Sequence, residues 1–411
     1  MLTPVLPSRA RRAPRALRAV ALLAAVPLAL SGCSSATTAT ESAPAGQSPA
    51  ADSAAVTPLA GGVPAPLAPA TPACGDGAAM LAAMSTRDKL AQVLMVGVRN
   101  GADARAVVNE HNVGGIFVGS WTDLSMLTDG TLAEIANIGP LPLAVSVDEE
   151  GGRVARLSAL IGPAPSARTM AQTMTPDEVY ALARSRGSQM RGLGITVDFA
   201  PVVDVSSQGA DTVIGDRSFS ADPETVTAYA GAFARGLRDA GVLPVLKHFP
   251  GHGSGSGDTH TESVNTPPLE QLQNTDLVPY RTLAGQAPVA VMVGHIEVPG
   301  LTGDVPASLS PAALGLLRSG GYGGPPFNGP VFTDDLSSMA AITARYGVAE
   351  AVLRALQAGN DVALWVTTDQ VPAVLDRLES AVGGGELSMA AVEASILRMA
   401  GIKGPNPRCG G

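Results

Sequence analysis

Ionisable residues of several chemical kinds gather in the segment 247–260, which reads KHFPGHGSGSGDTH. The segment holds Lys247, three of the five histidines of the chain, and Asp258. A carboxylate that accepts a hydrogen bond from one imidazole nitrogen fixes the tautomer of the ring and raises the basicity of the other nitrogen. Asp258-Thr259-His260 could therefore supply a proton donor with its orienting carboxylate, and the Ser/Gly-rich turn before it would let the loop move.

The same histidines allow a second interpretation, a zinc site. Imidazole and carboxylate groups are zinc ligands, and four of them could come from His248, His252, His260 and Asp258. We favour proton transfer, because His248 is expected to end a strand while the others lie on a glycine-rich loop that His252 would brace. We expect neither a metal nor an organic cofactor, and the sequence contains no HExxH, P-loop or dinucleotide-binding motif.

A second candidate catalytic group is Asp334, in the segment Thr333-Asp334-Asp335 that follows an apolar run. A carboxylate directly behind a buried strand is placed to attack an electrophilic carbon or to stabilise positive charge. The alternative is that it caps the following helix, a role that Asp335 could fill equally well. Taken alone, this segment leaves both interpretations open.

Groups that could bind a sugar follow another apolar run. The segment 148–153 (DEEGGR) places three acids and a glycine pair there. Asp148 could accept hydrogen bonds from two hydroxyls, and Arg156, Arg217 and Lys247 are available as complementary donors. Each of these residues alone fits a charge-balanced loop equally well.

The elements that must position these groups alternate regularly from about residue 76 onward. The strongest helices are predicted over Pro176–Arg191, opened by a capping box at Thr175, and over Pro223–Ala240, with Asp222 as N-cap. Eight strands are predicted over short apolar runs: Val93–Val98, Gly115–Val118, Leu143–Val147, Thr196–Ala200, Leu243–Leu246, Val289–Val293, Pro330–Phe332 and Asp361–Val366.

This alternation predicts an α/β fold, a single (β/α)8 TIM-type barrel without a second domain; an open doubly wound sheet is the alternative. Catalytic groups of such barrels lie at the C-terminal ends of the strands. Ionisable residues closely follow five of the runs: Asp148, Asp204, Lys247-His248, His295 and Asp334. Core packing does not explain these positions, so we favour a barrel over residues 75–405, with a short tail at 406–411.

The N-terminal region differs from the rest in composition. Five arginines precede the short apolar stretch 19–30, and small residues then lead to Cys33. This order is typical of an export signal and not of a membrane span. Residues 33–74 are mostly Ala, Pro, Ser and Thr, so they cannot bury a core and are predicted to form a disordered tether.

The overall composition limits the partners. The chain has 411 residues, 45% of them hydrophobic, so a substantial core is available. A net charge of −9 and the lack of a basic patch argue against nucleic acid. Cys74 and Cys409 flank the predicted barrel, and in an oxidising compartment they could form a disulfide or remain free thiols.

Taken together, the motifs resemble family 3 glycoside hydrolases, and most of all their bacterial β-N-acetylglucosaminidase branch. The resemblance extends from about Leu81 to Ile402. The matching segments keep the family order: DEEGGRVAR (148–156), VDFAPVVD (197–204), IGDRSFSADP (214–223), KHFPGHG (247–253), DTH (258–260), VPASLSP (305–311), TDDLS (333–337) and AGND (358–361).

The resemblance implies a retaining mechanism that passes through a glycosyl-enzyme. Asp334 matches the nucleophile, and His260, held by Asp258, matches the acid/base that this branch uses in place of a second carboxylate. The residues that match those gripping the terminal N-acetylglucosamine are Asp148, Arg156, Arg217, Lys247 and His248. Departures from the family pattern, among them Thr259 where Ser is usual, concern subsite detail.

The segment Leu30-Ser31-Gly32-Cys33 resembles a bacterial lipobox, which implies an exported protein that is lipid-anchored at the outer face of a bacterial cell membrane; a monomer is the default expectation. Residues 1–32 would be a lipoprotein signal peptide and Cys33 the lipidated N-terminus; an ordinary secretory signal is the alternative. The expected activity is removal of non-reducing terminal N-acetylglucosamine from peptidoglycan fragments, to water or to phosphate. The other interpretations are a β-glucosidase or β-xylosidase, a phosphorylase of the same family, and an inactive sugar-binding lipoprotein.

Overall fold

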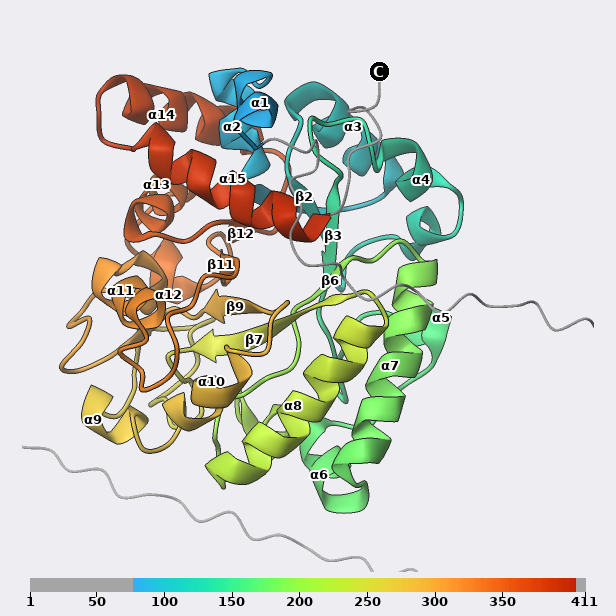
Figure 1. Cartoon of the computed structure of the whole chain (residues 1–411), viewed down its shortest axis with the longest axis vertical. Coiled ribbons are helices and arrows are strands. Elements are labelled where there is room, and N and C mark those ends of the chain that lie inside the picture. The colour runs from blue at the N-terminus through green and yellow to red at the C-terminus, as the bar shows by residue number, and fades with distance from the viewer. Residues whose placement is uncertain (1–76, 404–411) are drawn as a thin grey trace, which may run out of the picture. The chain divides into compact units, whose positions relative to one another are not determined.

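The computed structural model describes residues 77–403, and within them eight parallel strands form one sheet (Figure 1). Their order around the sheet is their order in the chain: β1 (Leu94–Val98), β2 (Gly115–Val118), β3 (Ala144–Val147), β6 (Val197–Asp198), β7 (Leu243–Phe249), β9 (Ala290–Val293), β11 (Val331–Thr333) and β12 (Ala363–Trp365). β12 pairs with β1, and Val362 bridges Phe332 of β11, so the sheet is a nearly closed barrel. The predicted α/β barrel is confirmed over the doubly wound sheet; the number of domains stays a prediction.

All eight predicted strands are present, and two differences in length have local causes. β6 has only two residues, because Pro201 lacks the N–H group that would extend the ladder. An isolated bridge between Val202 and Lys247 resumes the pairing. β7 continues to Phe249 through a register shift after Leu246, so Lys247 and His248 lie in the strand's last residues.

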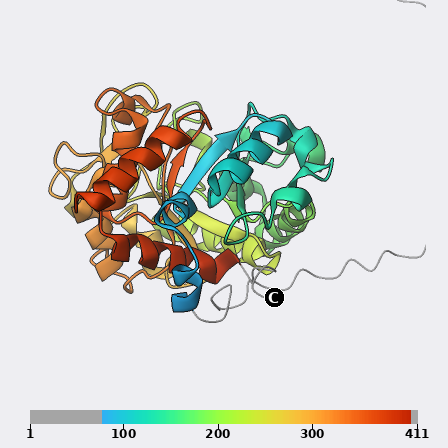
Figure 2. The ribbon, with the colours of Figure 1, turned by 90° about the horizontal axis from the view of Figure 1, so that it is seen from above.

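Helices connect the strands and lie around the outside of the sheet (Figures 1 and 2). The α-helices are α1 (Gly77–Ala82), α2 (Thr86–Gln92), α3 (Gly101–His111), α4 (Thr131–Ile135), α5 (Ser158–Ile161), α6 (Ala167–Thr173), α7 (Pro176–Gly192), α8 (Pro223–Asp239), α9 (Leu269–Leu272), α10 (Leu277–Leu283), α11 (Pro311–Ser319), α12 (Ala340–Thr343), α13 (Val348–Ala358), α14 (Val371–Gly383) and α15 (Met389–Lys403). The described residues also form three 3-10 helices: η1 (Leu124–Leu127), η2 (Gly215–Arg217) and η3 (Ala307–Leu309). Two small sheets pair β4 (Glu149–Gly151) with β5 (Val154–Ala155) and β8 (Val264–Asn265) with β10 (Ile296–Glu297).

The two long helices begin where the sequence predicts. Thr175 and Glu178 form the reciprocal capping box of α7, and Asp222 accepts a backbone N–H in the first turn of α8. The two helices pack closely, because Gly236 of α8 carries no side chain: a Cβ there would lie 2.6 Å from the carbonyl oxygen of Tyr180 on α7. Close packing of this pair supports the wall of the barrel beside β6 and β7.

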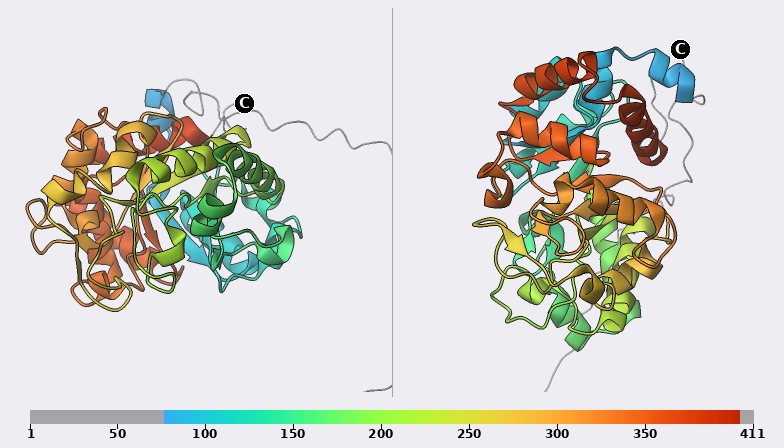
Figure 3. Two further views of the ribbon diagram at one scale, coloured as in Figure 1. Left: turned by 90° about the horizontal axis from the view of Figure 1, so that it is seen from below. Right: turned by 90° about the vertical axis from the view of Figure 1, so that its left-hand side faces the viewer.

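The second helix of the described chain lies beside the last two, with α14 and α15 against α2 (Figures 1 and 3). Lys89 Nζ of α2 lies 2.6 Å from Glu393 Oε1 of α15. Arg87 likewise forms ion pairs with Asp376 and Glu379 of α14. These contacts join the two ends of the described chain where β12 meets β1.

The core has two layers, one inside the barrel and one between the strands and helices. Successive strand residues point to opposite faces: Met95 of β1 packs inside, and its neighbour Leu94 packs toward the helices. Three aromatic rings cross the interior, with Phe199 5.8 Å from Phe117 and 5.5 Å from Phe332 between ring centroids. The barrel is therefore filled, and chemistry is confined to its ends.

Several predictions concern residues outside the described range. These are the signal peptide (1–32) with Cys33, the tether (33–74) with Cys74, and the tail (406–411) with Cys409, and all of them remain predictions. Within residues 77–403, no helix is both long enough and apolar enough to cross a membrane.

Candidate active site

An ion-pair cluster at the carboxyl end of the barrel is centred on Lys247. Its Nζ lies 2.6 Å from Asp148 Oδ1 and 2.6 Å from Glu150 Oε1. Glu150 also accepts two bonds from Arg217, each 2.8 Å long. Burial disfavours the charged forms of Glu150 and Lys247, but the opposite charges beside each of them have a larger effect. The pKa of Glu150 is therefore held well below its ordinary value, and the pKa of Lys247 lies above its ordinary value. Three predicted binding residues thus form one fixed, charged cluster.

His248 extends this cluster toward the centre of the site. Its Nε2 lies 3.5 Å from Arg217 Nη2, and its Nδ1 lies 2.7 Å from Asp204 Oδ2. Because a carboxylate faces Nδ1, we assign the proton to that nitrogen. Asp204 also accepts the backbone N–H groups of His248 and His252. Burial raises the pKa of Asp204, but the neighbouring His248 lowers this pKa by more, so that it lies below its ordinary value. Asp204 therefore positions His248.

The three consecutive acids after β3 have three different partners. Asp148 faces Lys247, and Glu150 faces Arg217 and Lys247. Glu149 instead lies 2.5 Å from Arg186 of α7 and accepts the N–H of Leu157, so it holds the β4–β5 hairpin to the wall. Only the first and third acids thus belong to the site.

Asp334 directly follows β11 and is a partly buried residue. Its Oδ1 accepts the N–H of Asp335 at 2.9 Å. Burial raises the pKa of Asp334, but the nearby His248 and His295 and this hydrogen bond lower it more, to about 2. Asp335 caps the following turn by accepting bonds from the next two serines, 337 and 338. The capping role therefore falls to Asp335, and Asp334 is left ionised and available.

The Asp258-Thr259-His260 turn lies beside the segment that follows Asp334. His260 Nδ1 is 2.6 Å from Asp258 Oδ1, and the His260 N–H donates to the same oxygen. Burial raises the pKa of Asp258, but the hydrogen bonds from His260 lower it by more, so the pKa lies below its ordinary value. The carbonyl groups of Thr259 and His260 accept the N–H groups of residues 341 and 340. The His260 side chain is 57% exposed, so its ring stands at the mouth of the site.

The loop that leads into this turn is held by hydrogen bonds to Asp276. Asp276 Oδ1 accepts the N–H of Gly253 at 3.2 Å and that of Val205 at 3.1 Å, which ties the turn to the β6 side of the barrel. Burial, and then the charge of Asp204, raise the pKa of Asp276 to about 7. His252 Nε2 lies 3.4 Å from the hydroxyl of buried Thr259, in agreement with the predicted bracing role.

One pocket of about 150 Å³ brings the candidates together. Four predicted site residues line it: Asp148, Arg156, His260 and Asp334. Among the described residues, the guanidinium of Arg156 has no hydrogen bond or ion pair, so it is available to a ligand. The remaining lining is largely apolar and comes from the barrel interior and from the ends of β2 and β12: Phe117, Phe199, Met292, Leu364, Val366 and Trp121. The pocket thus combines a proton donor, an ionised carboxylate and an apolar floor.

The zinc interpretation is not supported by the positions of the histidines. The Nδ1 atoms of His248 and His260 bind different carboxylates, those of Asp204 and Asp258. Nowhere in the range 77–403 do three His, Cys, Asp or Glu side chains form a group that could hold a metal ion.

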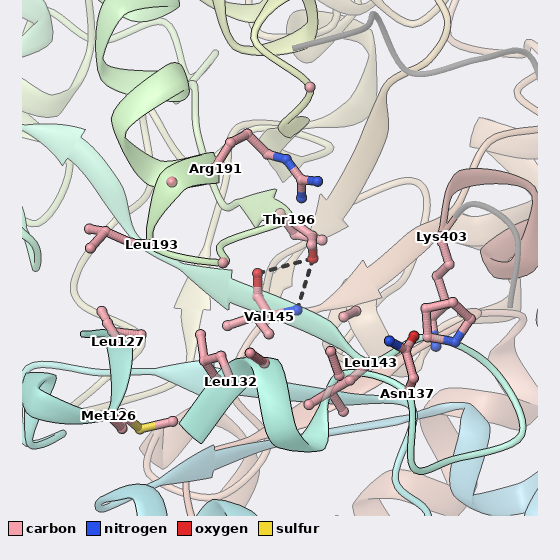
Figure 4. A pocket seen from close by; sticks show the side chains of 18 of the residues that line it. Met126, Leu127, Leu132, Asn137, Leu143, Val145, Arg191, Leu193, Thr196 and Lys403 are labelled. Carbon is pink, nitrogen blue, oxygen red and sulfur yellow. Dashed lines mark hydrogen bonds between the residues drawn. The ribbon is translucent and has the colours of Figure 1, made fainter. Parts of the chain in front are cut away.

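A larger cavity, of about 910 Å³, lies at the opposite end of the barrel (Figure 4). It is lined by the amino-terminal residues of β3, β6 and β7, together with Arg191 and Lys403. Figure 4 shows the Thr196 hydroxyl bonded to the backbone of Val145 there. None of the predicted site residues line this cavity, and catalysis in such barrels occurs at the other end. The smaller pocket is therefore the candidate active site.

Sequence reasoning missed three residues that build the site. Glu150 and Asp204 were visible in the motifs 148–156 and 197–204, but nothing in the sequence showed which acid would face which base. Trp121 carried no motif; a large aromatic residue three positions after a predicted strand was the one available signal.

Comparison with known proteins agrees with this site. Residues 85–402 match the family model described as the glycosyl hydrolase family 3 N terminal domain. The chain belongs to glycosyl hydrolase family 3. The expected glycoside hydrolase of this family, in its β-N-acetylglucosaminidase branch, is thereby confirmed by the match and by the relatives that follow.

One relative is the Beta-hexosaminidase LpqI of Mycobacterium tuberculosis, 63% identical over 396 residues, which are 96% of this chain and 99% of the relative. A solved structure of a family 3 glycosyl hydrolase from Mycobacterium smegmatis is 71% identical, covers 79% of this chain and 99% of its own, and has a TM-score of 0.79. A family 3 β-N-acetylglucosaminidase from a Paenibacillus species is 33% identical, covers 78% of this chain and 62% of its own, and has a TM-score of 0.73.

Proposed function

We propose that this protein is a retaining exo-β-N-acetylglucosaminidase that releases the non-reducing terminal sugar of peptidoglycan fragments through a covalent intermediate on Asp334. One observation carries the proposal: a single pocket is lined by the ionised Asp334 and by the ring of His260, whose other nitrogen is held by Asp258. The names of the relatives, a β-hexosaminidase and a β-N-acetylglucosaminidase, support the choice of sugar.

In the first step, Asp334 attacks the anomeric carbon while the bond from that carbon to the leaving oxygen breaks. His260 donates its Nε2 proton to the leaving oxygen, and Asp258 stabilises the imidazolium form that makes this possible. With a pKa of about 2, Asp334 is an anion at neutral pH and needs no base to activate it.

In the second step, a water molecule attacks the anomeric carbon from the side that the leaving group vacated. His260, now neutral, accepts the proton of the water, and the ester bond to Asp334 breaks. Two inversions at one carbon retain the configuration of the sugar. The imidazole thus serves first as an acid and then as a base.

The charged cluster holds the terminal sugar. Lys247 and Arg217 are donors to sugar hydroxyls, and Asp148 is an acceptor, and their mutual ion pairs hold them in place before the ligand arrives. Arg156, whose guanidinium has no partner among the described residues, supplies a further donor from the pocket wall. The apolar floor around Phe199 and Met292 suits the carbon atoms of the ring and the acetyl methyl group.

An imidazole in place of a second carboxylate has an electrostatic consequence. Most retaining glycosidases place two carboxyl groups about 5–5.5 Å apart, and each raises the pKa of the other. A neutral His260 does not repel Asp334, and it does not repel an anionic acceptor. Phosphate could therefore replace water in the second step.

The location of the enzyme is a further part of the proposal. A signal peptide over residues 1–32, lipidation at Cys33 and a tether over 33–74 would place the barrel at the outer face of the cell membrane, within reach of the wall polymer. A disulfide between Cys74 and Cys409 and a monomeric state belong to the same proposal.

The test is hydrolysis of an aryl β-N-acetylglucosaminide beside the aryl β-glucoside, for the wild type and Asp334→Ala, with and without phosphate. We expect turnover of the first substrate only, a loss of at least 10³-fold in the variant, and a product whose anomeric configuration by NMR is β at first. Asp211→Ala, at an exposed acid on a nearby loop, is the matched control and should retain full activity.

Two results would contradict the proposal. Normal turnover by Asp334→Ala would remove Asp334 from the mechanism. Faster turnover of the glucoside than of the N-acetylglucosaminide would assign the enzyme to another branch of the family.

A further inference from the structure

Trp121 is the most exposed of the large apolar side chains between residues 77 and 403, with 45% of its surface accessible. A single exposed apolar side chain is common on protein surfaces, but tryptophan is enriched at binding interfaces because its ring joins an apolar face to a polar N–H group. Trp121 lines the same pocket as Asp148, His260 and Asp334. Its exposed surface therefore belongs to the candidate active site.

The turn that carries Trp121 is built to hold the ring in place. The Thr122 hydroxyl donates to the Val98 carbonyl at 2.6 Å and accepts the Gly119 N–H at 3.0 Å, which pins both sides of the tryptophan. The ring lies so close to Gly119 that a Cβ at this position would be 2.4 Å from it. On another side, Phe117 makes an edge contact at 5.9 Å between centroids. Only a glycine at 119 allows this placement.

Beyond these contacts, 45% of Trp121 stays accessible. Its indole Nε1 makes no hydrogen bond to another residue of the range 77–403, and the residue is part of the pocket lining. An apolar face with an unused N–H donor at its edge matches a pyranose ring, which presents axial C–H groups on its face and hydroxyls at its rim.

We propose that Trp121 is the platform for the leaving-group sugar, the residue on the reducing side of the bond that is cleaved. This inference rests on the proposed function and names a specificity-determining residue for it. The buried cluster around Lys247 holds the terminal sugar in the interior of the site, while His260, which protonates the leaving oxygen, is 57% exposed at the mouth. Trp121 is exposed to a similar degree, so the sugar that packs on it is the one nearer to solvent.

The experiment compares two substrates with one glycosyl group and different leaving groups. N,N′-diacetylchitobiose has a sugar to place on Trp121, and β-N-acetylglucosaminyl fluoride has none. Trp121→Ala should lower kcat/KM for the disaccharide about tenfold, the size expected for one lost aromatic contact, and leave kcat/KM for the fluoride and the competitive inhibition constant of free N-acetylglucosamine unchanged. Trp121→Phe, which keeps a ring, should lose less than about threefold.

The matched control is Leu160→Ala, which removes an exposed apolar side chain of α5 that does not line the pocket; it should leave both substrates unchanged. Equal losses on the disaccharide and the fluoride, or no loss on either, would overturn the inference and leave the proposed function intact. A wild type that turns over neither substrate would overturn the proposed function and the inference with it. A urea midpoint for Trp121→Ala equal to that of the wild type excludes unfolding as the cause of a loss.

Discussion

Glu150 is the carboxylate that keeps two buried cations in the site, and Glu150→Gln tests whether their pairing holds the cluster together. The change keeps the size of the side chain and removes its charge. Arg217 then loses its carboxylate partner, while Lys247 keeps Asp148, at 2.6 Å. The variant therefore contains one buried, unpaired guanidinium.

The expected cost follows from that charge. Removing one partner of a buried ion pair destabilises a protein by about 3–5 kcal/mol, and we take about 3 kcal/mol, because the amide oxygen of glutamine still accepts one hydrogen bond. For a region of the size of residues 77–403, the entropy of unfolding is on the order of 0.7 kcal/mol/K. A loss of about 3 kcal/mol then lowers Tm by roughly 4 °C.

The same reasoning gives a pH dependence with a definite sign. The pKa of Glu150 is lower in the folded protein than the value of about 4.3 in an unfolded chain. Its stabilising contribution is therefore complete above that value and is lost as the pH falls toward the folded pKa. Between pH 7 and pH 3.5, the difference in stability between wild type and variant should shrink by about 1 kcal/mol.

The assay is urea unfolding at both pH values, followed by the fluorescence of Trp365, which is fully buried in the native state. Glu270→Gln, at an exposed acid on α9, is the control and should change the free energy of unfolding by less than about 0.5 kcal/mol. An unchanged midpoint for Glu150→Gln at pH 7, or a loss of the same size at both pH values, would refute the electrostatic argument.

Three further outcomes are expected. Asp258→Asn removes the carboxylate that stabilises the His260 imidazolium, so kcat on the disaccharide should fall by 10²-fold or more; an unchanged kcat would argue against this role. Gly236→Ala places a Cβ 2.6 Å from a backbone oxygen and should cost about 1–3 kcal/mol in urea unfolding, whereas Gly315→Ala, in open space on α11, should be neutral or stabilising. Asp276 has a folded pKa raised to about 7, so its ionisation lowers stability as the pH rises from about 4 toward 7; Asp276→Asn should therefore gain on the wild type between pH 5 and pH 8, and a constant difference would contradict the shift.

The elements of the barrel were predictable because each of them depends on residues that are close together in the sequence. Fully buried parallel strands read as continuous apolar runs, and the eight runs between residues 93 and 366 became the eight strands of the sheet. The start of α7 was predictable in the same way, because the partners of its capping box are three residues apart. The small sheet of β8 and β10 was not, because two-residue strands carry no periodicity that a sequence can show.

The sequence predicted most residues of the candidate site, but it did not predict which acid would pair with which base. Asp258 and His260 are two residues apart, so their contact follows from the sequence alone. Glu149 and Glu150 are neighbours of the same type, yet one faces Arg186 of the wall and the other Arg217 of the site. That difference arises from the turn of the β4–β5 hairpin and from bases 37 and 67 residues away.

The sequence by itself determined the class of fold, the family and the chemical identity of the proposed nucleophile and proton donor, because short motifs with fixed spacing carry all three. Only the tertiary structure decided that Asp335 caps the turn and leaves Asp334 free, that Asp204 orients His248, and that Trp121 lines the same pocket as His260. These depend on groups brought together from separate strands, and the free energy of such long-range contacts is set by the packing of the whole barrel and not by any one segment.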